Sequence, residues 1–287
     1  MIGGIDRFAV TLLTVALVAA CQGGSGAIVH PTGANELVLR IETGGGNVRP
    51  FSIVGRIPEL SVFGDGRVIV VGPQDAIFPG PTLHNLVTFR LSEAGLQALL
   101  ENARAAGLLR ADAHYDYPGI ADAGTTTFTV VAEGRRHVVS AYALFEGGPT
   151  NFPIDPNVLR ARAALSAFQG RALDMRPWLG QAIMEPESAY RYETLRVFVT
   201  ASQPQEPAEI DPSFADWPLA TPLAALGAPL VDFAEMRCGG VTGAELEVLR
   251  PALENSNQLT FWRSAGMTYQ LTLRPLLPDE SGCPTGI

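Results

Sequence analysis

The densest group of chemically reactive side chains in this sequence lies in one short segment, residues 112–122. Asp112, His114 and Asp116 alternate there with alanine and tyrosine, and Asp122 ends the segment. Carboxylates bind hard cations, and a carboxylate beside an imidazole can do general acid–base work. The oxygen and glycine spacing of a calcium-binding EF-hand is not met. The same composition is typical of a solvated loop, which is the interpretation we prefer.

The sequence lacks the motifs that are typical of other catalytic mechanisms. The chain has no GxSxG segment, the motif that exposes the serine of many hydrolases. All twenty basic residues are arginine, which excludes Schiff-base chemistry on lysine and a Walker phosphate loop. The histidines show neither HxH nor HxxxH spacing, and they are His30, His84, His114 and His137. We therefore expect no cofactor and no metal, and a non-enzymatic role over an enzymatic one.

Trp262 is a second candidate for contact with a ligand or partner. Side chains alternate between the two faces of a strand, so Trp262 shares a face of the predicted strand 259–262 with Thr260. We interpret that face as the polar one, and exposed aromatic residues are enriched at interfaces. The alternative is that the proline-rich segment 203–229 covers this tryptophan.

The first residues of the chain predict export. Arg7 precedes an apolar run, residues 8–20, that is too short to span a membrane and ends in small residues. Cys21 follows directly, and this arrangement resembles the lipobox of bacterial lipoproteins, whose cysteine is diacylated. Two acyl chains give stable attachment, at about 0.8 kcal/mol per buried methylene. The alternatives are an ordinary signal peptide cut after Ala20 and an uncleaved anchor.

The composition agrees with a folded protein held outside the cytosol. Hydrophobic residues make up 47% of the chain and charged residues 17%, which is enough to fill a core. The net charge of −9 and the lack of a basic run argue against nucleic-acid partners and against electrostatic binding to anionic lipid. We expect a signal peptide over 1–20 and a flexible tether over 21–35, with the lipid on Cys21 supplying the membrane contact.

Two further cysteines, Cys238 and Cys283, remain if Cys21 carries lipid. An exported protein meets oxidising conditions, and the spacing of these residues fits no zinc motif. We therefore expect a structural disulfide between them. Closing a loop of about 45 residues stabilises a fold by about 4 kcal/mol.

The remaining sequence divides into two units of mixed helix and strand. In the first unit, 36–175, the turn sequence 64–66 (Gly-Asp-Gly) lies between two apolar runs and predicts a β-hairpin. Ser92 and Asp155 are typical helix-capping residues and start the two helices expected here. The strands expected in this unit are 37–42, 60–63, 67–71, 125–131 and 136–144.

The second unit spans 190–287. Thr242 with Glu245 three residues later is a capping box, which predicts a helix. A hairpin follows this helix, so helix-then-hairpin occurs in both units. We interpret this as a weak internal duplication, with chance similarity as the alternative. The segment 203–229 carries six prolines and is expected to be an insertion or a covering loop. The strands expected in this unit are 195–199, 259–262 and 269–273.

Four segments also carry a likeness to known proteins: Phe63–Ile69, Leu91–Gly95, Thr126–Thr129 and Arg274–Glu280, the last of them shortly before Cys283. On these segments the chain resembles an uncharacterised family of exported lipoproteins found mainly in actinobacteria and Chloroflexi. The first unit is also similar in element order to a domain of unknown function found in other lipoproteins. The resemblance covers most of the mature chain and implies an exported α+β protein. It transfers no activity and no catalytic residue.

Taken together, the sequence predicts an α+β fold: antiparallel sheets made of β-hairpins, with helices packed on one face, in two related lobes. We expect a membrane-anchored, extracytoplasmic lipoprotein that binds an envelope protein or a small ligand without converting it. One alternative is a hydrolase or metal-binding enzyme that uses Asp112, His114 and Asp116. The other alternative is an inhibitor of secreted hydrolases.

Overall fold

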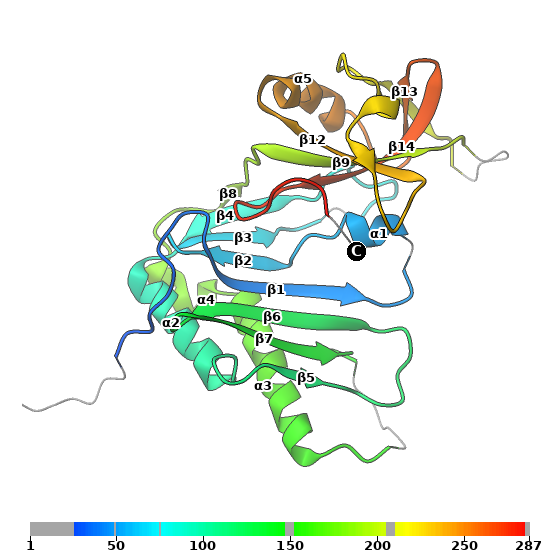
Figure 1. Ribbon diagram of the computed structural model, residues 1–287. Coiled ribbons are helices and arrows are strands. Elements are labelled where there is room, and N and C mark those ends of the chain that lie inside the picture. Colours follow the sequence, from blue (N-terminus) through cyan, green and yellow to red (C-terminus); the bar gives the residue numbers. More distant parts are fainter. Residues whose placement is uncertain (1–25, 49, 75, 147–151, 205–209, 285–287) are drawn as a thin grey trace, which may run out of the picture.

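The structure is a computed structural model, and it describes residues 26–48, 50–74, 76–146, 152–204 and 210–284. The predicted signal peptide and Cys21 lie outside these ranges. Two β-sheets, each covered by helix on one face, form a larger and a smaller lobe, and the short helix α1 (Pro50–Val54) lies between them (Figure 1). None of the helices in the described ranges is long and apolar enough to cross a membrane.

The larger lobe is built on an eight-stranded sheet in the order β5-β7-β6-β1-β2-β3-β4-β8. Its neighbouring strands are antiparallel, except that β5 and β7 at one edge run parallel. Its strands are β1 (Leu37–Gly45), β2 (Leu60–Phe63), β3 (Arg67–Val71), β4 (Leu86–Arg90), β5 (Ala113–Tyr115), β6 (Gly124–Ala132), β7 (Arg135–Tyr142) and β8 (Ser188–Ala189).

The smaller lobe is built on a six-stranded sheet in the order β10-β13-β14-β9-β12-β11. Only β10 and β13, again at an edge, run parallel. Its strands are β9 (Thr194–Ala201), β10 (Ser213–Asp216), β11 (Ala228–Pro229), β12 (Met236–Thr242), β13 (Thr260–Ser264) and β14 (Met267–Pro275). The predicted α+β fold is thus confirmed, and each sheet adds one parallel edge pair that was not predicted.

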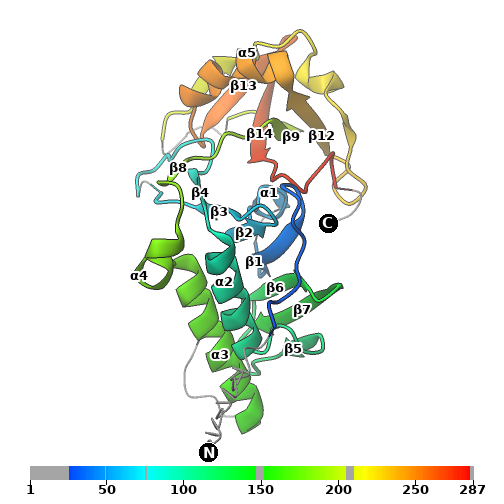
Figure 2. The same ribbon diagram turned by 90° about the vertical axis from the view of Figure 1, so that its left-hand side faces the viewer.

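Helices α2 (Glu93–Ala105) and α3 (Pro156–Leu173) cover one face of the larger sheet (Figure 2). Both predicted caps are confirmed. Ser92 accepts a hydrogen bond from the backbone N–H of Gly95 at 3.2 Å, and Asp155 accepts one from Asn157 at 2.7 Å. A single turn, α4 (Arg176–Leu179), and the 3₁₀ turn η1 (Gly180–Ala182) lead back to the sheet.

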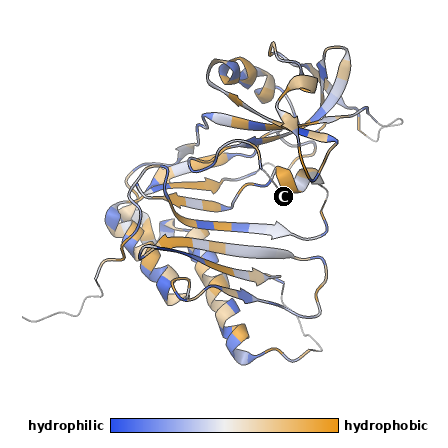
Figure 3. Cartoon of the chain, viewed as in Figure 1, coloured by the Kyte–Doolittle hydropathy of each residue, from blue (hydrophilic) through white to orange (hydrophobic). Residues whose placement is uncertain are grey.

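The core of the larger lobe lies between these helices and the sheet, where β2 and β3 are mostly hydrophobic (Figure 3). Phe168 of α3 packs edge-on against Phe128 of β6, with ring centroids 6.0 Å apart. Ile28 is buried in the same core, and its backbone N–H and C=O both bond to the side chain of Gln97. The tether predicted over 21–35 is therefore packed against the larger lobe from Ile28 onward, because burying this apolar side chain is more favourable in free energy than leaving it in water.

Three predicted hairpin turns are confirmed. Two of these turns have positive φ angles, between +50° and +79°, at both central residues. They are Glu133–Gly134 between β6 and β7, and Ala265–Gly266 between β13 and β14. Such primed turns match the right-handed twist of the strands that they join. In the β2–β3 turn Gly66 has φ +83°, and a Cβ atom there would lie 2.3 Å from the carbonyl oxygen of Leu91. Only glycine fits that position.

Helix α5 (Gly243–Glu254) covers one face of the smaller sheet. Its inward side chains are Leu246, Leu249 and Leu253. Thr242 stands at the N-cap as predicted, but its side chain makes no capping hydrogen bond, so the predicted capping box with Glu245 is wrong. The next residue, Gly243, has φ +54°, so the chain does not enter this helix with the dihedral angles of a regular first turn.

The proline-rich segment 203–229 was predicted to be an insertion or a covering loop, but part of it belongs to the smaller sheet. It supplies the edge strand β10, the 3₁₀ turn η2 (Leu223–Ala225) and the edge strand β11 of the smaller sheet. It also buries Trp217 and Leu223 in the core beneath α5. Proline is tolerated at sheet edges because an edge strand leaves one side of its backbone unpaired.

The order helix-then-hairpin occurs in both lobes, as α2 before β6–β7 and as α5 before β13–β14. The hairpins join their sheets differently, however. In the larger lobe the first hairpin strand, β6, pairs with β1, whereas in the smaller lobe the second hairpin strand, β14, pairs with β9. The likeness between the lobes therefore does not extend to strand order.

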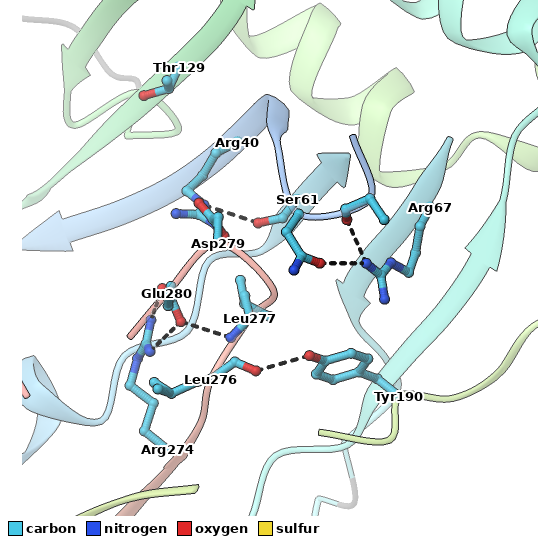
Figure 4. A network of polar contacts seen from close by, with 12 residues as sticks. Arg40, Ser61, Arg67, Thr129, Tyr190, Arg274, Leu276, Leu277, Asp279 and Glu280 are labelled. Carbon is cyan, nitrogen blue, oxygen red and sulfur yellow. Dashed lines mark hydrogen bonds and ion pairs between the residues drawn. The ribbon is translucent and has the colours of Figure 1, made fainter. Parts of the chain in front are cut away.

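A C-terminal strap, residues 274–283, fastens the smaller lobe to the larger one (Figure 4). Arg274 donates hydrogen bonds to both carboxylate oxygens of Glu280, at 2.7 and 2.6 Å, and its Nε donates to the carbonyl oxygen of Arg56 at 2.6 Å. Arg56 follows α1 in the larger lobe. One guanidinium group thus holds the strap and connects the two lobes.

The rest of the strap makes further contacts with the larger lobe. Asp279 pairs with Arg40 of β1 at 2.8 Å, and Leu277 is buried against Phe63 in a small cluster. The predicted disulfide between Cys238 and Cys283 is present and ties the end of the strap to β12. By the chain-entropy model this cross-link stabilises the fold by about 4 kcal/mol.

The pH dependence of stability tests the ion pair. Burial raises the pKa of Glu280, but the hydrogen bonds and charge of Arg274 outweigh burial and hold the pKa below its ordinary value of 4.5. The pair therefore stabilises the fold above pH 4.5, and its contribution is lost as the pH falls through the lower, folded-state pKa. Glu280→Gln should lower the free energy of unfolding by about 3 kcal/mol at pH 7, because it leaves Arg274 buried without its countercharge.

Denaturant unfolding of both chains at pH 7 and at pH 3 measures this effect, and the difference between wild type and Glu280→Gln should shrink at the lower pH. Glu187→Gln is the control, because its pair with Arg176 is largely exposed, and such pairs contribute about 0–1 kcal/mol. Equal, small effects of the two substitutions would contradict a structural role for the buried pair.

Candidate functional site

A cleft of about 1220 Å³ lies between the two lobes. Its walls come from α1 and the turn after it, from the loop 72–85 between β3 and β4, and from strands β9 and β14 of the smaller sheet. Segments 232–236 and 257–260 complete the lining. Figure 2 shows α1 between the smaller sheet and the strands of the larger sheet. The cleft is larger than the range of about 300–1,000 Å³ usual for small-molecule sites.

Strand register places polar side chains on the cleft face of the smaller sheet. Tyr269 and Leu273 of β14 lie in the core beneath α5. Gln270 and Thr272 alternate with these residues, so they point to the opposite face, toward the larger lobe. Thr200 of β9 is paired with Gln270, so it lies on the same face. The floor of the cleft is therefore an interior part of the sheet with an amide and two hydroxyl groups.

Exposed aromatic rings border the cleft. Phe78 in the loop 72–85 is 66% exposed, and Phe51 of α1 is about half exposed. Large apolar side chains exposed beside a concave, partly polar surface are typical of binding sites. The ring of Phe78 therefore offers exposed apolar contact area at the border of the cleft.

Three amide side chains of the cleft share one hydrogen-bond pattern. The side-chain oxygen of Gln258 accepts from the backbone N–H of Gly80, that of Asn257 accepts from Leu259, and that of Gln270 accepts from Ser202. The NH₂ group of each amide has no hydrogen-bond partner among the described residues. The three amides therefore present NH₂ donors to the cleft, and the oxygens of Gln258 and Gln270 each keep a lone pair that can accept a further hydrogen bond.

The ionisable groups of the cleft almost balance. Arg56, Asp232 and Glu235 contribute one positive and two negative charges. His84 also faces the cleft, and although part of its ring is open, the surrounding walls withdraw it from bulk water and lower the pKa of its imidazole. The histidine is therefore neutral at neutral pH, where it offers one N–H donor and one acceptor.

The charge state of His84 can be measured directly. A lowered pKa means that the midpoint of the imidazole titration, followed by NMR, lies below the ordinary value of 6.5 in the folded protein. The same ring in urea-unfolded protein should titrate near 6.5, because desolvation by the cleft is then lost. A folded-state midpoint at or above 6.5 would show that the cleft does not desolvate this residue.

The structure brings together only part of the predicted group in segment 112–122. His114 lies on the edge strand β5, where its Nε2 is 2.9 Å from Asp116 and its Nδ1 is 2.7 Å from the hydroxyl of Ser140 on β7. Asp112 is engaged elsewhere, because its carboxylate accepts from Arg135 and from the backbone N–H of Val138. Within the described ranges, no three histidine, cysteine, aspartate or glutamate residues gather as metal ligands would.

This arrangement is a hydrogen-bonded line of serine, imidazole and carboxylate, and Ser140 was not predicted. Sequence alone could not place it, because Ser140 meets His114 only through the parallel pairing of β5 with β7. The line lies in water: the side chain of His114 is 51% exposed and that of Asp116 is 82% exposed. It is also separate from the cleft, whose lining contains none of the three residues.

The prediction that Trp262 is exposed is wrong. Trp262 borders the cleft but is only 1% exposed. Its ring packs edge-on against Trp217 at 5.9 Å, and Trp217 comes from the proline-rich segment 203–229. Trp262 faces the core beneath α5 together with its strand partner Tyr269, so the face we interpreted as polar is the buried one.

The chain matches no protein-family model, no curated protein and no solved structure. The cleft residues that the sequence did not indicate come from the short helix α1, from loops and from single faces of strands. These are chiefly Phe51, Phe78, Asn257, Gln258 and Gln270.

Proposed function

We propose that this protein is an extracytoplasmic lipoprotein that binds a ligand in the cleft between its lobes without converting it. The observation that carries the proposal is the cleft itself, which is large, bordered by exposed phenyl rings and furnished with unpaired amide NH₂ groups. The side chains of Gln258 and Gln270 are exposed and that of Asn257 is half-buried, so their NH₂ groups are hydrated in the free protein and can exchange water for an acceptor on a ligand. A ligand that brings both acceptors and apolar surface would satisfy both features of the lining.

The predicted anchor and the fold are compatible. Among the described residues Ile28 is the first that is packed into the larger lobe, and it lies seven positions after Cys21. Fully extended, those residues span at most about 25 Å. A lipid on Cys21 would therefore hold the larger lobe close to the membrane, and the family resemblance on Phe63–Ile69 and the other quoted segments supports an exported location.

The effect of an envelope extract on thermal stability tests the binding function. A soluble extract of bacterial cell envelopes should raise the melting temperature of the full-length protein by about 5 °C, the shift that about 2 kcal/mol of binding free energy gives in a chain of this size. Phe78→Ala should weaken this binding roughly tenfold, because it removes an aromatic contact. The substitution should leave the unliganded melting temperature almost unchanged, because the ring is exposed.

Phe145→Ala is the matched control. Phe145 is 61% exposed, close to the value for Phe78, but it lies after β7 and outside the cleft. The proposal predicts that this variant responds to the extract like the wild type. Absence of any shift with the wild-type protein, or an equal loss in both variants, would contradict binding in the cleft.

The line of Ser140, His114 and Asp116 favours a second candidate function, a serine hydrolase. His114 is placed to accept the proton of the Ser140 hydroxyl while Asp116 stabilises the resulting imidazolium. The acyl group of an ester would transfer to the Ser140 oxygen as the alcohol leaves with a proton from His114. Water would then release the acid.

A fluorophosphonate probe tests this candidate, because it reacts covalently with activated serines. If Ser140 is activated, the wild-type protein is labelled at pH 8, and labelling is lost in Ser140→Ala and reduced by at least about a hundredfold in His114→Ala. Ser202→Ala, which removes a hydroxyl just after β9 in the smaller lobe, should label like the wild type. Absence of labelling in the wild type would exclude the hydrolase.

A further inference from the structure

We infer that the outer face of α3 lies against the surface of a membrane that contains anionic phospholipid. This α3 face is the exposed side of the helix between Leu159 and Leu173, together with the adjoining Trp178. The inference rests on the proposed function, because it requires the lipid anchor predicted at Cys21. It follows from the apolar character of the face, its charge, its tryptophan and its distance from the predicted anchor.

The outer side of α3 is apolar for a helix that faces water. Across residues 161–170 only two alanines and a glycine are exposed, and the half-buried Ser166 adds a single hydroxyl group. Leu159 and Leu173, at the two ends of the face, are 45% and 41% exposed. A helix that covers a sheet normally carries charged and polar side chains on its outer side, and a helix that is apolar all round is normally covered. The outer side of α3 therefore lacks the residues expected of a surface in contact with water alone.

α3 is a basic helix in a chain whose net charge is −9. It contains three arginines and no carboxylate, whereas α2 has two glutamates and one arginine, and α5 has three glutamates and one arginine. Arg162 is buried, but Arg160 and Arg171 are exposed. Neither exposed arginine pairs with a carboxylate among the described residues: Arg160 donates to the side-chain oxygen of Asn157, and the guanidinium of Arg171 lies 4.4 Å from the centre of the Trp178 ring. Exposed guanidinium groups beside an apolar strip suit the phosphates of lipid headgroups.

Trp178 places an aromatic ring at one end of the α3 face. Its indole N–H donates to the carbonyl oxygen of Arg171 at 2.9 Å, and the side chain is only half-buried. The other two tryptophans, Trp217 and Trp262, are 8% and 1% exposed. Tryptophan is enriched at membrane–water interfaces, where its apolar ring and its polar N–H each find suitable surroundings. Trp178 is therefore suited to an interfacial contact and can report it by fluorescence.

The predicted anchor can reach a membrane that touches this face. Gln97 of α2 bonds to the backbone of Ile28, and α2 lies beside α3 over the same face of the larger sheet (Figure 2). Axes of packed helices are about 8–10 Å apart. Ile28 lies seven positions after Cys21, a stretch that spans at most about 25 Å. A lipid on Cys21 is therefore within reach of a bilayer that lies on α3.

A second copy of the chain fits the α3 face less well than an anionic surface does. A two-fold pair of antiparallel α3 helices would bring two identical surfaces together. In a pair centred on the middle of the helix, Arg160 of one copy would lie near Arg171 of the other, and neither helix contains a carboxylate to separate them. Like charges at an interface oppose association. Anionic lipid supplies the negative charge that a second α3 lacks.

Tryptophan fluorescence of the complete protein in vesicles tests the inference. The protein is purified with its native anchor and reconstituted into vesicles of phosphatidylcholine and phosphatidylglycerol that contain brominated acyl chains, which quench tryptophan on contact. We expect quenching of the wild type and loss of that quenching in Trp178→Phe. In vesicles of phosphatidylcholine alone, quenching should fall by at least about twofold, because the surface then carries no net negative charge. Equal quenching in Trp178→Phe, or no dependence on phosphatidylglycerol, would overturn the inference.

Variants of the α3 face locate the contact. Leu159→Asp places a negative charge on the apolar strip and should remove most of the quenching, and Arg160→Gln should reduce it about twofold in the anionic vesicles. Val248→Asp is the matched control, because Val248 is 55% exposed on α5 in the smaller lobe, and it should be quenched like the wild type. Melting curves verify that each variant is folded. Quenching of Leu159→Asp equal to that of the wild type would contradict contact through this face.

Flotation of the vesicles in a density gradient separates failure of this inference from failure of the predicted anchor. An anchored protein rises with the vesicles whichever face it presents to them. Flotation without quenching of Trp178 would overturn this inference and leave the anchored location supported, whereas protein that does not float would overturn both. A wild-type dimer in sedimentation that becomes a monomer in Leu159→Asp would also overturn the inference, because the α3 face would then join two copies. Binding in the cleft is tested independently by the envelope extract.

Discussion

The guanidinium group of Arg274 is the point on which the arrangement of the two lobes depends. Its three nitrogen atoms donate to Glu280 and to the carbonyl oxygen of Arg56, at 2.6–2.7 Å. The side chains of Arg274 and Glu280 are only 8% and 16% exposed. Withdrawing both charges from water is costly, and the cost is offset only when the geometry is good and further hydrogen bonds are made. The backbone N–H of Leu277, which also bonds to Glu280, supplies one of them.

This interaction matters for the cleft because Arg56 is itself part of its wall. The neighbouring Gly55 approaches β14 so closely that a Cβ atom there would lie 2.6 Å from the side chain of Thr272 on the cleft floor. The larger and smaller lobes therefore meet with almost no free space beside the cleft. On the other side of the strap, the hydroxyl of Tyr190 donates to the carbonyl oxygen of Leu276 at 3.0 Å, and burial raises the pKa of Tyr190 to about 12. A cleft whose walls are fixed in this way loses little conformational entropy when a ligand binds.

The parts of the fold that the sequence predicts well are those specified by neighbouring residues. Turns such as Gly64–Gly66 and Glu133–Gly134 need residues that tolerate positive φ, and caps such as Ser92 need a side-chain acceptor next to a helix, so local patterns identify them. The disulfide was predictable because the assignment of lipid to Cys21 left only two cysteines. Edge strands β5, β10 and β11 were missed because they are short and are held by their partners more than by their own sequence.

The cleft could not be predicted, because its residues come from segments that are far apart in the chain. Phe51 and Gln270 share it although more than two hundred positions separate them, and nothing local marks either residue as a ligand contact. Trp262 shows the related limit of periodicity. The alternation of side chains predicts that the two faces of strand β13 differ, but it does not say which face α5 covers. Here Phe261, on the face opposite Trp262, is buried as well. In the same way, Ser140 could be joined to His114 only once the register of β5 on β7 was known.

The two polar sites of the molecule differ most in their access to water, and this difference favours binding over catalysis. The effective dielectric constant near an exposed pair is high, so the carboxylate of Asp116 can polarise His114 only weakly. A catalytic group also needs a pocket that holds the reacting atoms close to it, and the line of Ser140, His114 and Asp116 lies outside the cleft. The cleft has the opposite properties: it is concave and partly desolvated, as the lowered pKa of His84 indicates, and amides, hydroxyls and rings line it beside the ionisable groups of Arg56, His84, Asp232 and Glu235. The cleft, and not the exposed line of Ser140, His114 and Asp116, is therefore the place where a ligand can be enclosed.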